Sequence, residues 1–255
     1  MPVKDSLPPA ETAARLEAAG RAAGFDVEHF GEAEGCPLLA LSRRSPGLRP
    51  RVYLSAGIHG DEPAPPLALL GLLEAGAFDS RATWFLCPLL NPAGFLRQHR
   101  ENAGGIDLNR DYRVTRSLEV AAHRRWLARQ PNFDLALCVH EDWESLGYYL
   151  YEQNAAGGAG LAAGILAAAA AHCPIDLSPT IDGREAVGGV IHPPGDIFAR
   201  ELWAEAVYLR AHHSRLIYTL ESPSAFPLAA RIAAHRAALA AALADLARFT
   251  LQRIL

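Results

Sequence analysis

The chain has 255 residues, of which 50% are hydrophobic and 20% are charged, and its formal net charge at pH 7 is −4. A chain of this length and composition can bury a sizeable core, which argues against intrinsic disorder. The slightly negative charge, with no run of Lys or Arg, argues against nucleic acid as a partner.

The sequence shows no sign of export or membrane insertion. Its first 20 residues, MPVKDSLPPAETAARLEAAG, lack the apolar core that a secretory signal needs. No stretch of about 18 apolar residues is free of charge, so no membrane span is expected. The four cysteines form no CxxC pair, which argues against a disulfide framework and a thiolate zinc site. We therefore expect a cytoplasmic protein without a membrane partner.

Apolar runs and helical patterns alternate along most of the chain. In chain order they predict a helix over 9–23, strands over 25–30, 37–42 and 51–56, a helix over 63–75, a strand over 83–90, a helix over 116–129, strands over 134–139 and 146–151, a helix over 155–172, a strand over 216–220 and a helix over 227–253. This alternation predicts an α/β fold with three αβα layers around a mixed, largely parallel central sheet. No repeat or linker interrupts the pattern, so residues 1–255 are expected to form a single catalytic domain.

A histidine and a glutamate follow the predicted strand at 51–56, in the string GIHGDE. His59 and Glu62 are separated by two residues in a bend, where both side chains can reach one metal ion. Imidazole and carboxylate groups are normal zinc ligands. The pair alone also fits an ordinary surface loop.

Two further candidates, His140 and Glu221, come directly after predicted strands. Ligands in open α/β sheets bind outside the carboxyl ends of the strands, so residues distant in sequence can converge there. A catalytic zinc site typically has three protein ligands, and His140 would complete a set with His59 and Glu62. A carboxylate such as Glu221 can serve as the general base beside a metal-activated water. Taken singly, each residue also fits a strand-end histidine or an exposed glutamate.

The segment at 91–112, NPAGFLRQHRENAGGIDLNRDY, is rich in Asn, Arg and Gly. Arginine is the side chain best suited to hold a carboxylate, because its guanidinium group donates two parallel hydrogen bonds. Arg97, Arg100, Arg110 and Arg113 are available in or beside this segment. A solvated basic loop is the ordinary alternative for Arg97 and Arg113.

Taken in order, these strings resemble the zinc carboxypeptidase family and its relatives, which include murein peptide amidases, succinylglutamate desuccinylase and aspartoacylase. The matching strings are GIHGDEP, LNPAGF, RENAGGIDLNRDY, VHED and TLESP, and they extend over about two-thirds of the chain. A lone HxxE is weak evidence, but the whole ordered set is specific. The resemblance implies a zinc carboxypeptidase-like fold.

The resemblance also implies a site that holds one zinc ion. His59, Glu62 and His140 match the metal ligands of the family, and Glu221 matches its general base. Arg100 matches the arginine that polarises the scissile carbonyl and stabilises the oxyanion.

Three further roles follow from the DLNR string. Asn109 and Arg110 match the pair that binds the terminal carboxylate of the substrate. Asp107 matches an acid that orients the first histidine ligand, since the outer hydrogen bond of a ligand fixes its tautomer.

One element of the peptidase pattern is missing. The peptidases have a tyrosine on a mobile loop before the general-base strand, and it contacts the terminal carboxylate. The corresponding stretch here, GGVIHPPGDIF, contains no tyrosine, and His192 is the nearest substitute by order. This departure puts standard carboxypeptidase activity in doubt.

Acidic residues follow His140, namely Glu141, Asp142 and Glu144. They are interpreted either as an acidic rim that selects a basic or diaminopimelate-type group, or as a solvated acidic turn.

The function expected from the sequence is a zinc metallocarboxypeptidase that uses a metal-activated water to hydrolyse the C-terminal amide bond of a short peptide. The first alternative keeps this chemistry but takes an N-acyl amino acid, as a desuccinylase or aspartoacylase does. The alternative from another class is a non-catalytic binding module on the same scaffold. A Ser/His/Asp hydrolase is disfavoured because no GxSxG string occurs.

Overall fold

The computed structural model describes residues 9–193, 195–244, 246–247 and 249. Its centre is an eight-stranded sheet with the strand order β1-β2-β4-β3-β5-β10-β6-β9. These strands are β1 (Asp26–Ala33), β2 (Cys36–Arg43), β3 (Arg51–Ala56), β4 (Thr83–Cys87), β5 (Leu135–Asp142), β6 (Tyr149–Asn154), β9 (Val190–Ile191) and β10 (Leu216–Pro223). A separate hairpin consists of β7 (Thr180–Ile181) and β8 (Arg184–Glu185).

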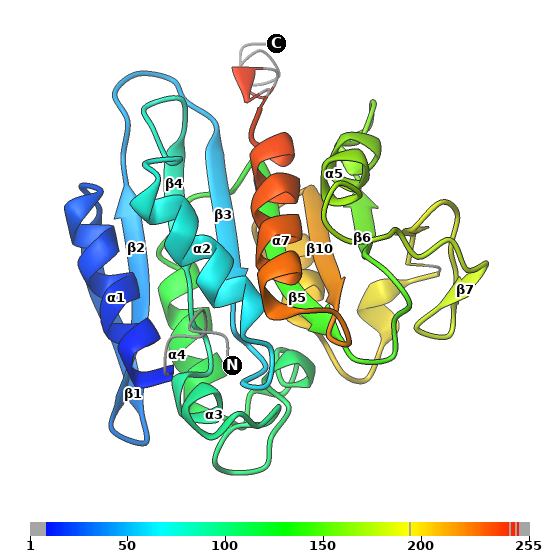
Figure 1. Ribbon diagram of the computed structural model, residues 1–255. Helices are drawn as coiled ribbons and strands as arrows, with labels where there is room; N and C mark the ends of the chain where they lie inside the picture. The colour runs from blue at the N-terminus through cyan, green and yellow to red at the C-terminus, as the bar shows by residue number, and fades with distance from the viewer. Residues whose placement is uncertain (1–8, 194, 245, 248, 250–255) are drawn as a thin grey trace, which may run out of the picture.

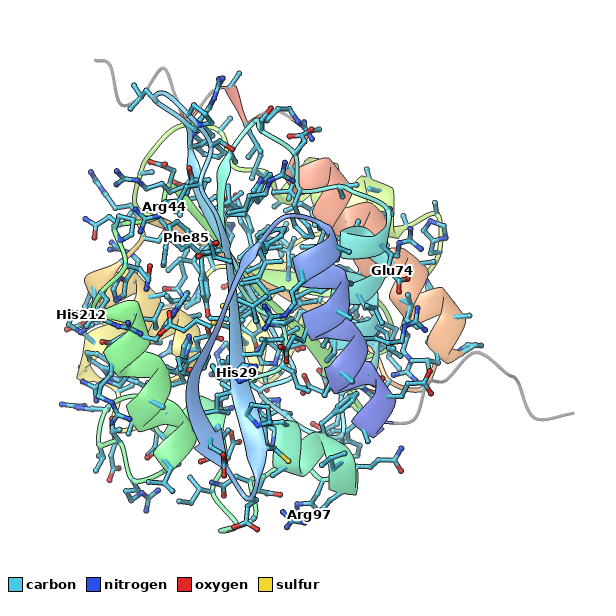
Figure 2. All side chains as sticks on the ribbon, turned by 90° about the vertical axis from the view of Figure 1, so that its left-hand side faces the viewer. His29, Arg44, Glu74, Phe85, Arg97 and His212 are labelled. Carbon is cyan, nitrogen blue, oxygen red and sulfur yellow. The ribbon has the colours of Figure 1, made fainter. Side chains whose placement is uncertain are left out.

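Helices cover both faces of the sheet. They are α1 (Pro9–Ala22), α2 (Ala64–Glu74), α3 (Pro92–Arg97), α4 (Leu118–Leu127), α5 (Ala162–Ala169), α6 (Glu205–His212) and α7 (Leu228–Ala242). Helices α1, α2, α5 and α7 pack over one face, and α4 and α6 over the other (Figure 1). Figure 2, seen from the β1 edge, shows α1 and α4 on opposite sides of the sheet. The predicted three-layer αβα architecture is confirmed.

The sheet is mixed, with a parallel centre. Strands β4, β3, β5 and β10 run parallel to one another. Strands β1, β2 and β6 add antiparallel pairings toward the two edges. The central strands are almost continuously buried, as expected for parallel strands with helices on both faces.

Side chains alternate between the two faces along each strand. On β3, Leu54 packs in the core beneath α1, α2 and α7, whereas Tyr53 packs in the core beneath α4 and α6. On β5, Cys138 belongs to the second core, so His140, two residues further along, also faces that side. This alternation decides which strand residues can take part in a common site.

Two strands extend further than the sequence indicates. β5 continues to Asp142 and β10 to Pro223, because the two strands stay paired in register to those residues. His140 and Glu221 therefore lie inside paired strands and not beyond strand ends. The sheet fixes their backbone positions, which a loop would leave free.

The helices show the largest differences from the prediction. The helix predicted over 155–172 is wrong in its first part, because Gly157 and Gly158 have positive φ angles of 79° and 78° and α5 begins only at Ala162. The closing helix α7 ends at Ala242, and part of the stretch predicted to continue it lies outside the described residues. Helices α3 and α6 were not predicted. In the part of the chain that the structure describes, no helix is long and apolar enough to cross a membrane.

Candidate metal centre and its cavity

The loop between β3 and α2 carries His59 and Glu62. Gly57 begins it with a φ of 62°, in the left-handed region that favours glycine. Gly60 lies so close to its surroundings that an added Cβ would be 2.1 Å from the carbonyl carbon of Gly94. Its N–H also donates a 3.3 Å hydrogen bond to the carbonyl of Arg100. The loop is therefore held tightly against α3 and the segment that follows it.

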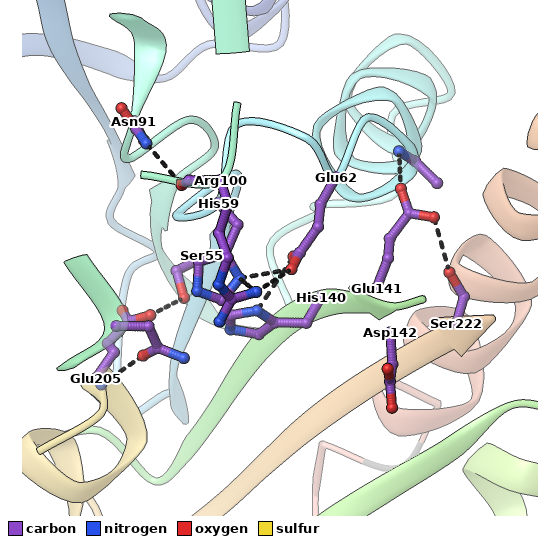
Figure 3. Close-up of polar contacts among 12 residues, drawn as sticks. Ser55, His59, Glu62, Asn91, Arg100, His140, Glu141, Asp142, Glu205 and Ser222 are labelled. Atoms are coloured by element: carbon purple, nitrogen blue, oxygen red, sulfur yellow. Dashed lines mark hydrogen bonds and ion pairs between the residues drawn. The ribbon is translucent and has the colours of Figure 1, made fainter. Parts of the chain in front are cut away.

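Three side chains that could hold a metal ion meet at this point (Figure 3). Nδ1 of His59 lies 2.5 Å from Glu62 Oε1, and Nδ1 of His140 lies 3.2 Å from Glu62 Oε2. Each of the three residues is 3% exposed. Glu62 Oε2 is buried without a hydrogen-bond partner. A buried carboxylate whose two oxygens each face an imidazole nitrogen, with one of them lacking a hydrogen-bond donor, fits a divalent cation and suits zinc.

The charges of this cluster depend strongly on one another. Burial of the His59 ring opposes its protonation, but the Glu62 and Asp107 carboxylates outweigh burial and raise its pKa to about 9. Burial would raise the pKa of Glu62, yet His59 and His140 together hold it well below its ordinary value. The raised pKa of His59 and the lowered pKa of Glu62 thus reflect one mutual attraction between the imidazole and the carboxylate.

Asp107 and Arg100 flank the first histidine. Asp107 Oδ1 lies 3.3 Å from Nε2 of His59, on the side of the ring away from Glu62. Its Oδ2 accepts hydrogen bonds of 3.2 Å and 3.0 Å from the Arg100 guanidinium group. Arg100 NH1 lies 3.8 Å from Glu62 Oε1. Asn91, which caps α3, donates its side-chain amide to the carbonyl of Arg100 and so supports this segment.

Glu221 reaches the same place from β10. It pairs in register with His140 on β5 and with Tyr149 on β6, so the three side chains project from the same face of the sheet. Burial raises the pKa of Glu221 well above its ordinary value, an effect that His140 partly opposes.

A cavity of about 360 Å³ opens over these groups. His59, Glu62, His140, Arg100 and Glu221 line it together with Asn109 and Arg110. The side-chain oxygen of Asn109 accepts a 2.9 Å hydrogen bond from the backbone N–H of Glu205 at the start of α6. The structure thus brings all of the residues singled out in the DLNR and RxN strings to one cavity, except that Asp107 lies behind His59.

The sequence and the fold can now be compared with known proteins. Residues 49–178 match the model of the succinylglutamate desuccinylase/aspartoacylase catalytic domain. The chain belongs to this family. The resemblance drawn from the motifs is therefore confirmed. A comparison with curated proteins found no match.

Solved structures share the fold of this desuccinylase/aspartoacylase family member. A crystal structure from Shewanella amazonensis, provisionally assigned as a metallopeptidase, is 26% identical with a TM-score of 0.79, and the match covers 93% of this chain and 92% of that one. A similarly assigned protein from Shewanella denitrificans is 25% identical with a TM-score of 0.82, covering 93% and 90%. A metallo-carboxypeptidase from Burkholderia cenocepacia, 20% identical over 96% of this chain and 70% of that one with a TM-score of 0.69, shares the fold.

His192 does not line the cavity. It follows β9 and is exposed, and its Nδ1 lies 3.8 Å from Glu152 Oε2. Glu152 alternates with Tyr151 and Gln153 along β6, so it points to the opposite face of the sheet. Position along the sequence could not reveal this, because the side taken by His192 depends on how β9 pairs with β6.

Two tyrosines that the sequence analysis did not single out line the cavity instead. Tyr149 and Tyr151 stand on the same face of β6, and Tyr149 donates a 2.9 Å hydrogen bond to Asp142 Oδ2. The alternation of side chains along the predicted strand over 146–151 could have shown that Tyr149 and Tyr151 share a face. It could not show that this face is the one with the cavity, because the pairing of Tyr149 with Glu221 cannot be read from the sequence.

The acidic stretch after His140 is divided between the two faces of the sheet. Asp142 and Glu144 line the cavity beside Trp143, whose side chain is 76% exposed. The carboxylate of Glu141 lies on the opposite face and pairs with Arg231 of α7. An acidic rim that includes the Glu141 carboxylate is therefore wrong, because neighbouring residues of a strand point in opposite directions.

Proposed function

We propose that this protein is a zinc-dependent hydrolase that cleaves the amide bond beside a free C-terminal carboxylate, in a short peptide or an N-acyl amino acid. The observation that carries the proposal is the meeting of three side chains that could hold a metal ion, the half-buried carboxylate of Glu221 and the exposed guanidinium group of Arg110 around one cavity. Membership of the desuccinylase/aspartoacylase family supports hydrolysis of an amide.

His59, Glu62 and His140 would hold the ion. A zinc ion in such a site acts as a Lewis acid that polarises a carbonyl and lowers the pKa of a water. Asp107 accepts a hydrogen bond from Nε2–H of His59, which keeps Nδ1 turned toward Glu62.

Glu221 is the proposed general base. Its carboxylate takes the proton of the attacking water and returns it to the departing nitrogen. The Arg100 guanidinium group, held by Asp107, would stabilise the negative charge that develops on the carbonyl oxygen.

Asn109 and Arg110 are the proposed grip for the terminal carboxylate. Because the oxygen of the Asn109 side chain is taken by the N–H of Glu205, its amino group is left to donate to a ligand. The Arg110 guanidinium group is exposed and lines the cavity. Two such donors would fix the bond to be cut relative to Glu221.

The test is to measure zinc content and turnover together. The wild-type protein should bind one zinc ion and release an amino acid from a panel of dipeptides, a murein tripeptide and N-acyl amino acids. Glu221→Gln should keep the zinc ion and lose about 10²- to 10⁴-fold in kcat, the usual contribution of a general base. A zinc-loaded protein that hydrolyses none of the panel, or a Glu221→Gln variant with full activity, contradicts the proposal.

One observation favours a substrate whose released amino acid is acidic. Arg184 and Arg200 line the cavity together with Arg110. Burial, and then the guanidinium groups of Arg184 and Arg110, lower the pKa of Arg200. Arg184 pairs with Asp182, which also lines the cavity, so Arg110 and Arg200 are the cations that a second carboxylate on the substrate would meet. The basic or diaminopimelate-type group, one of the two interpretations of the acidic stretch, would instead have to use Asp142 and Glu144.

Substrates that differ only in the released residue separate these choices. Arg200→Gln should lower kcat/KM about tenfold or more for a substrate that releases Glu and leave one that releases Ala nearly unchanged, because only the first offers a second carboxylate. The exposed Arg125 of α4 provides the control variant, Arg125→Gln, which should change neither value. A wild-type preference for Lys over Glu would favour the acidic side of the cavity.

A further inference from the structure

Glu141 borders the cavity, but its carboxylate lies on the opposite face of the sheet. It follows His140 on β5, and its carboxylate lies on the face covered by α2 and α7 (Figure 3). The residue is 5% exposed. A buried carboxylate beside a proposed metal ligand, on the other face of the sheet from the proposed metal site, has no role in the chemistry proposed above.

The contacts of this carboxylate connect three separate segments of the chain. Glu141 Oε1 accepts a 2.7 Å hydrogen bond from the backbone N–H of Ala64, two residues after Glu62. Glu141 Oε2 accepts a 3.4 Å hydrogen bond from the hydroxyl of Ser222, the residue after Glu221. The guanidinium group of Arg231 on α7 donates to the same oxygen. One carboxyl group thus contacts a residue two positions after Glu62 and the residue directly after Glu221, and Glu141 is itself the neighbour of His140.

We propose that Glu141 is a positioning residue, which sets the spacing of Glu62, His140 and Glu221 from the reverse side of the sheet. The inference rests on the proposed function, since it assigns roles to those three residues. Each of them is either next to Glu141 in the chain or within two residues of a group that hydrogen-bonds to the Glu141 carboxylate. A shift of the carboxylate would therefore move a metal ligand or the general base.

Stability alone does not explain the arrangement. A buried ion pair such as Glu141 with Arg231 is often no more stabilising than apolar side chains of the same volume, because both charges lose their water. The pair does, however, supply a fixed geometry that flexible apolar side chains would not. The expected signature of the residue is thus a change in metal binding, beyond any change in unfolding.

The experiment uses the full chain and compares Glu141→Gln with a matched control, Asp176→Asn. Asp176 is also 5% exposed and accepts backbone N–H groups, from Leu146 and Ser178, but it does not line the cavity. Zinc affinity and the rate of zinc loss to a chelator are measured for both, with urea unfolding, kcat and KM. Glu141→Gln should weaken zinc binding about tenfold, the lower end of the cost of losing a direct partner of a ligand, and lower kcat more than it raises KM.

Asp176→Asn should change unfolding alone. Equal zinc affinity and equal kcat in the two variants would overturn the proposal, whatever their stabilities. If Glu141→Gln does not fold, Arg231→Gln takes its place, because it frees the same carboxylate from the α7 side. Unchanged zinc loss in folded Arg231→Gln would likewise overturn it. Zinc affinity also separates this inference from the proposed function: a wild-type protein that binds zinc but hydrolyses nothing refutes the function while leaving the Glu141 comparison intact.

Discussion

Among single residues, Arg110 has the plainest geometry for recognition. Its guanidinium group is exposed, lines the cavity and donates within the molecule only to the neighbouring carbonyl of Asn109, among the contacts of the described residues. Arg100, in contrast, is already held by two hydrogen bonds to Asp107. The two arginines should therefore respond differently to substitution.

Arg110→Ala is expected to raise KM about 10- to 100-fold with a smaller effect on kcat, since a hydrogen bond to a charged group contributes roughly 1.5–3 kcal/mol. Arg110→Lys should recover only part of the loss, because an ammonium group cannot form the paired bonds of a guanidinium group. Steady-state kinetics on the best substrate of the panel measure both. A change confined to kcat would place Arg110 in the chemical step instead.

The sequence was sufficient for the residues that are fixed by local spacing. His59 and Glu62 share one short loop, so their spacing is written directly in the chain. His140 joins them because parallel strands bring their carboxyl ends to one edge. The face taken by Glu141 and His192 could not be predicted in the same way, since it depends on strand register and on a two-residue strand with almost no sequence signal.

Among the elements, the contact between the β3–α2 loop and α3 controls the geometry of the site. A Cβ at Gly60 would lie 2.4 Å from the carbonyl oxygens of both Gly94 and His99. These atoms are backbone, so they cannot swing aside as a flexible side chain would. Helix α3 is short and was not predicted, because six residues with a proline at the start give almost no helical periodicity.

Gly60→Ala is expected to destabilise the protein by about 1–3 kcal/mol, as overpacking usually does, and to weaken zinc binding, because the loop carries two of the proposed ligands. The matched control is Gly164→Ala in α5, where an added Cβ meets nothing within 4 Å. That variant should be neutral or slightly more stable, since alanine favours a helix. Urea unfolding and a zinc competition assay measure the pair. A Gly60→Ala protein with wild-type zinc affinity would show that the loop tolerates displacement.

At the scale of the whole molecule, the core on the α4 and α6 side contains a buried network of hydrogen bonds around His123, and the network requires this histidine to be neutral. The Tyr53 hydroxyl donates a 2.6 Å hydrogen bond to Glu205 and lies 3.0 Å from Nε2 of His123. Nδ1 of the same ring lies 2.7 Å from the Tyr112 hydroxyl. Burial, together with the charge of His213, lowers the pKa of His123 to about 3. Every group of this network has a partner when His123 donates from Nε2 to the Tyr53 hydroxyl and accepts at Nδ1 from the Tyr112 hydroxyl.

The hydrogen-bond network around His123 predicts that the free energy of unfolding falls in acid. The pKa of His123 is lower in the folded state than the ordinary value of about 6.5, so the unfolded state binds more protons between those values. The stabilisation is complete above about pH 6.5 and declines as the pH falls toward 3, by at most about 1.4 kcal/mol per pH unit for this one group. Urea unfolding of the metal-free protein between pH 7.5 and 5 measures the slope. His123→Gln should make it shallower, whereas His172→Gln, at an exposed position, should not.

The fold as a whole was predictable because strands β3, β4, β5 and β10 are compact apolar runs with helical patterns between them. Helix α6 was not predicted, because its sequence EAVYLRAH is too short to show a clear helical periodicity. Its first residue, Glu205, is also buried, whereas the hydrophobicity pattern predicts an acidic residue to be exposed. Tertiary contacts with Tyr53 and Ser55 make that burial possible.

The exposure of Trp143 gives the protein an optical probe of its own. Trp84 and Trp126 are 0% and 2% exposed, whereas Trp143 is 76% exposed where the cavity meets solvent. Indole emission depends on contact with water, so a ligand that covers Trp143 would alter the intrinsic fluorescence against the signal of the two interior indoles and of the half-buried Trp203. Ligand titrations can therefore be followed without a label or a chromogenic group, and for compounds that are never turned over.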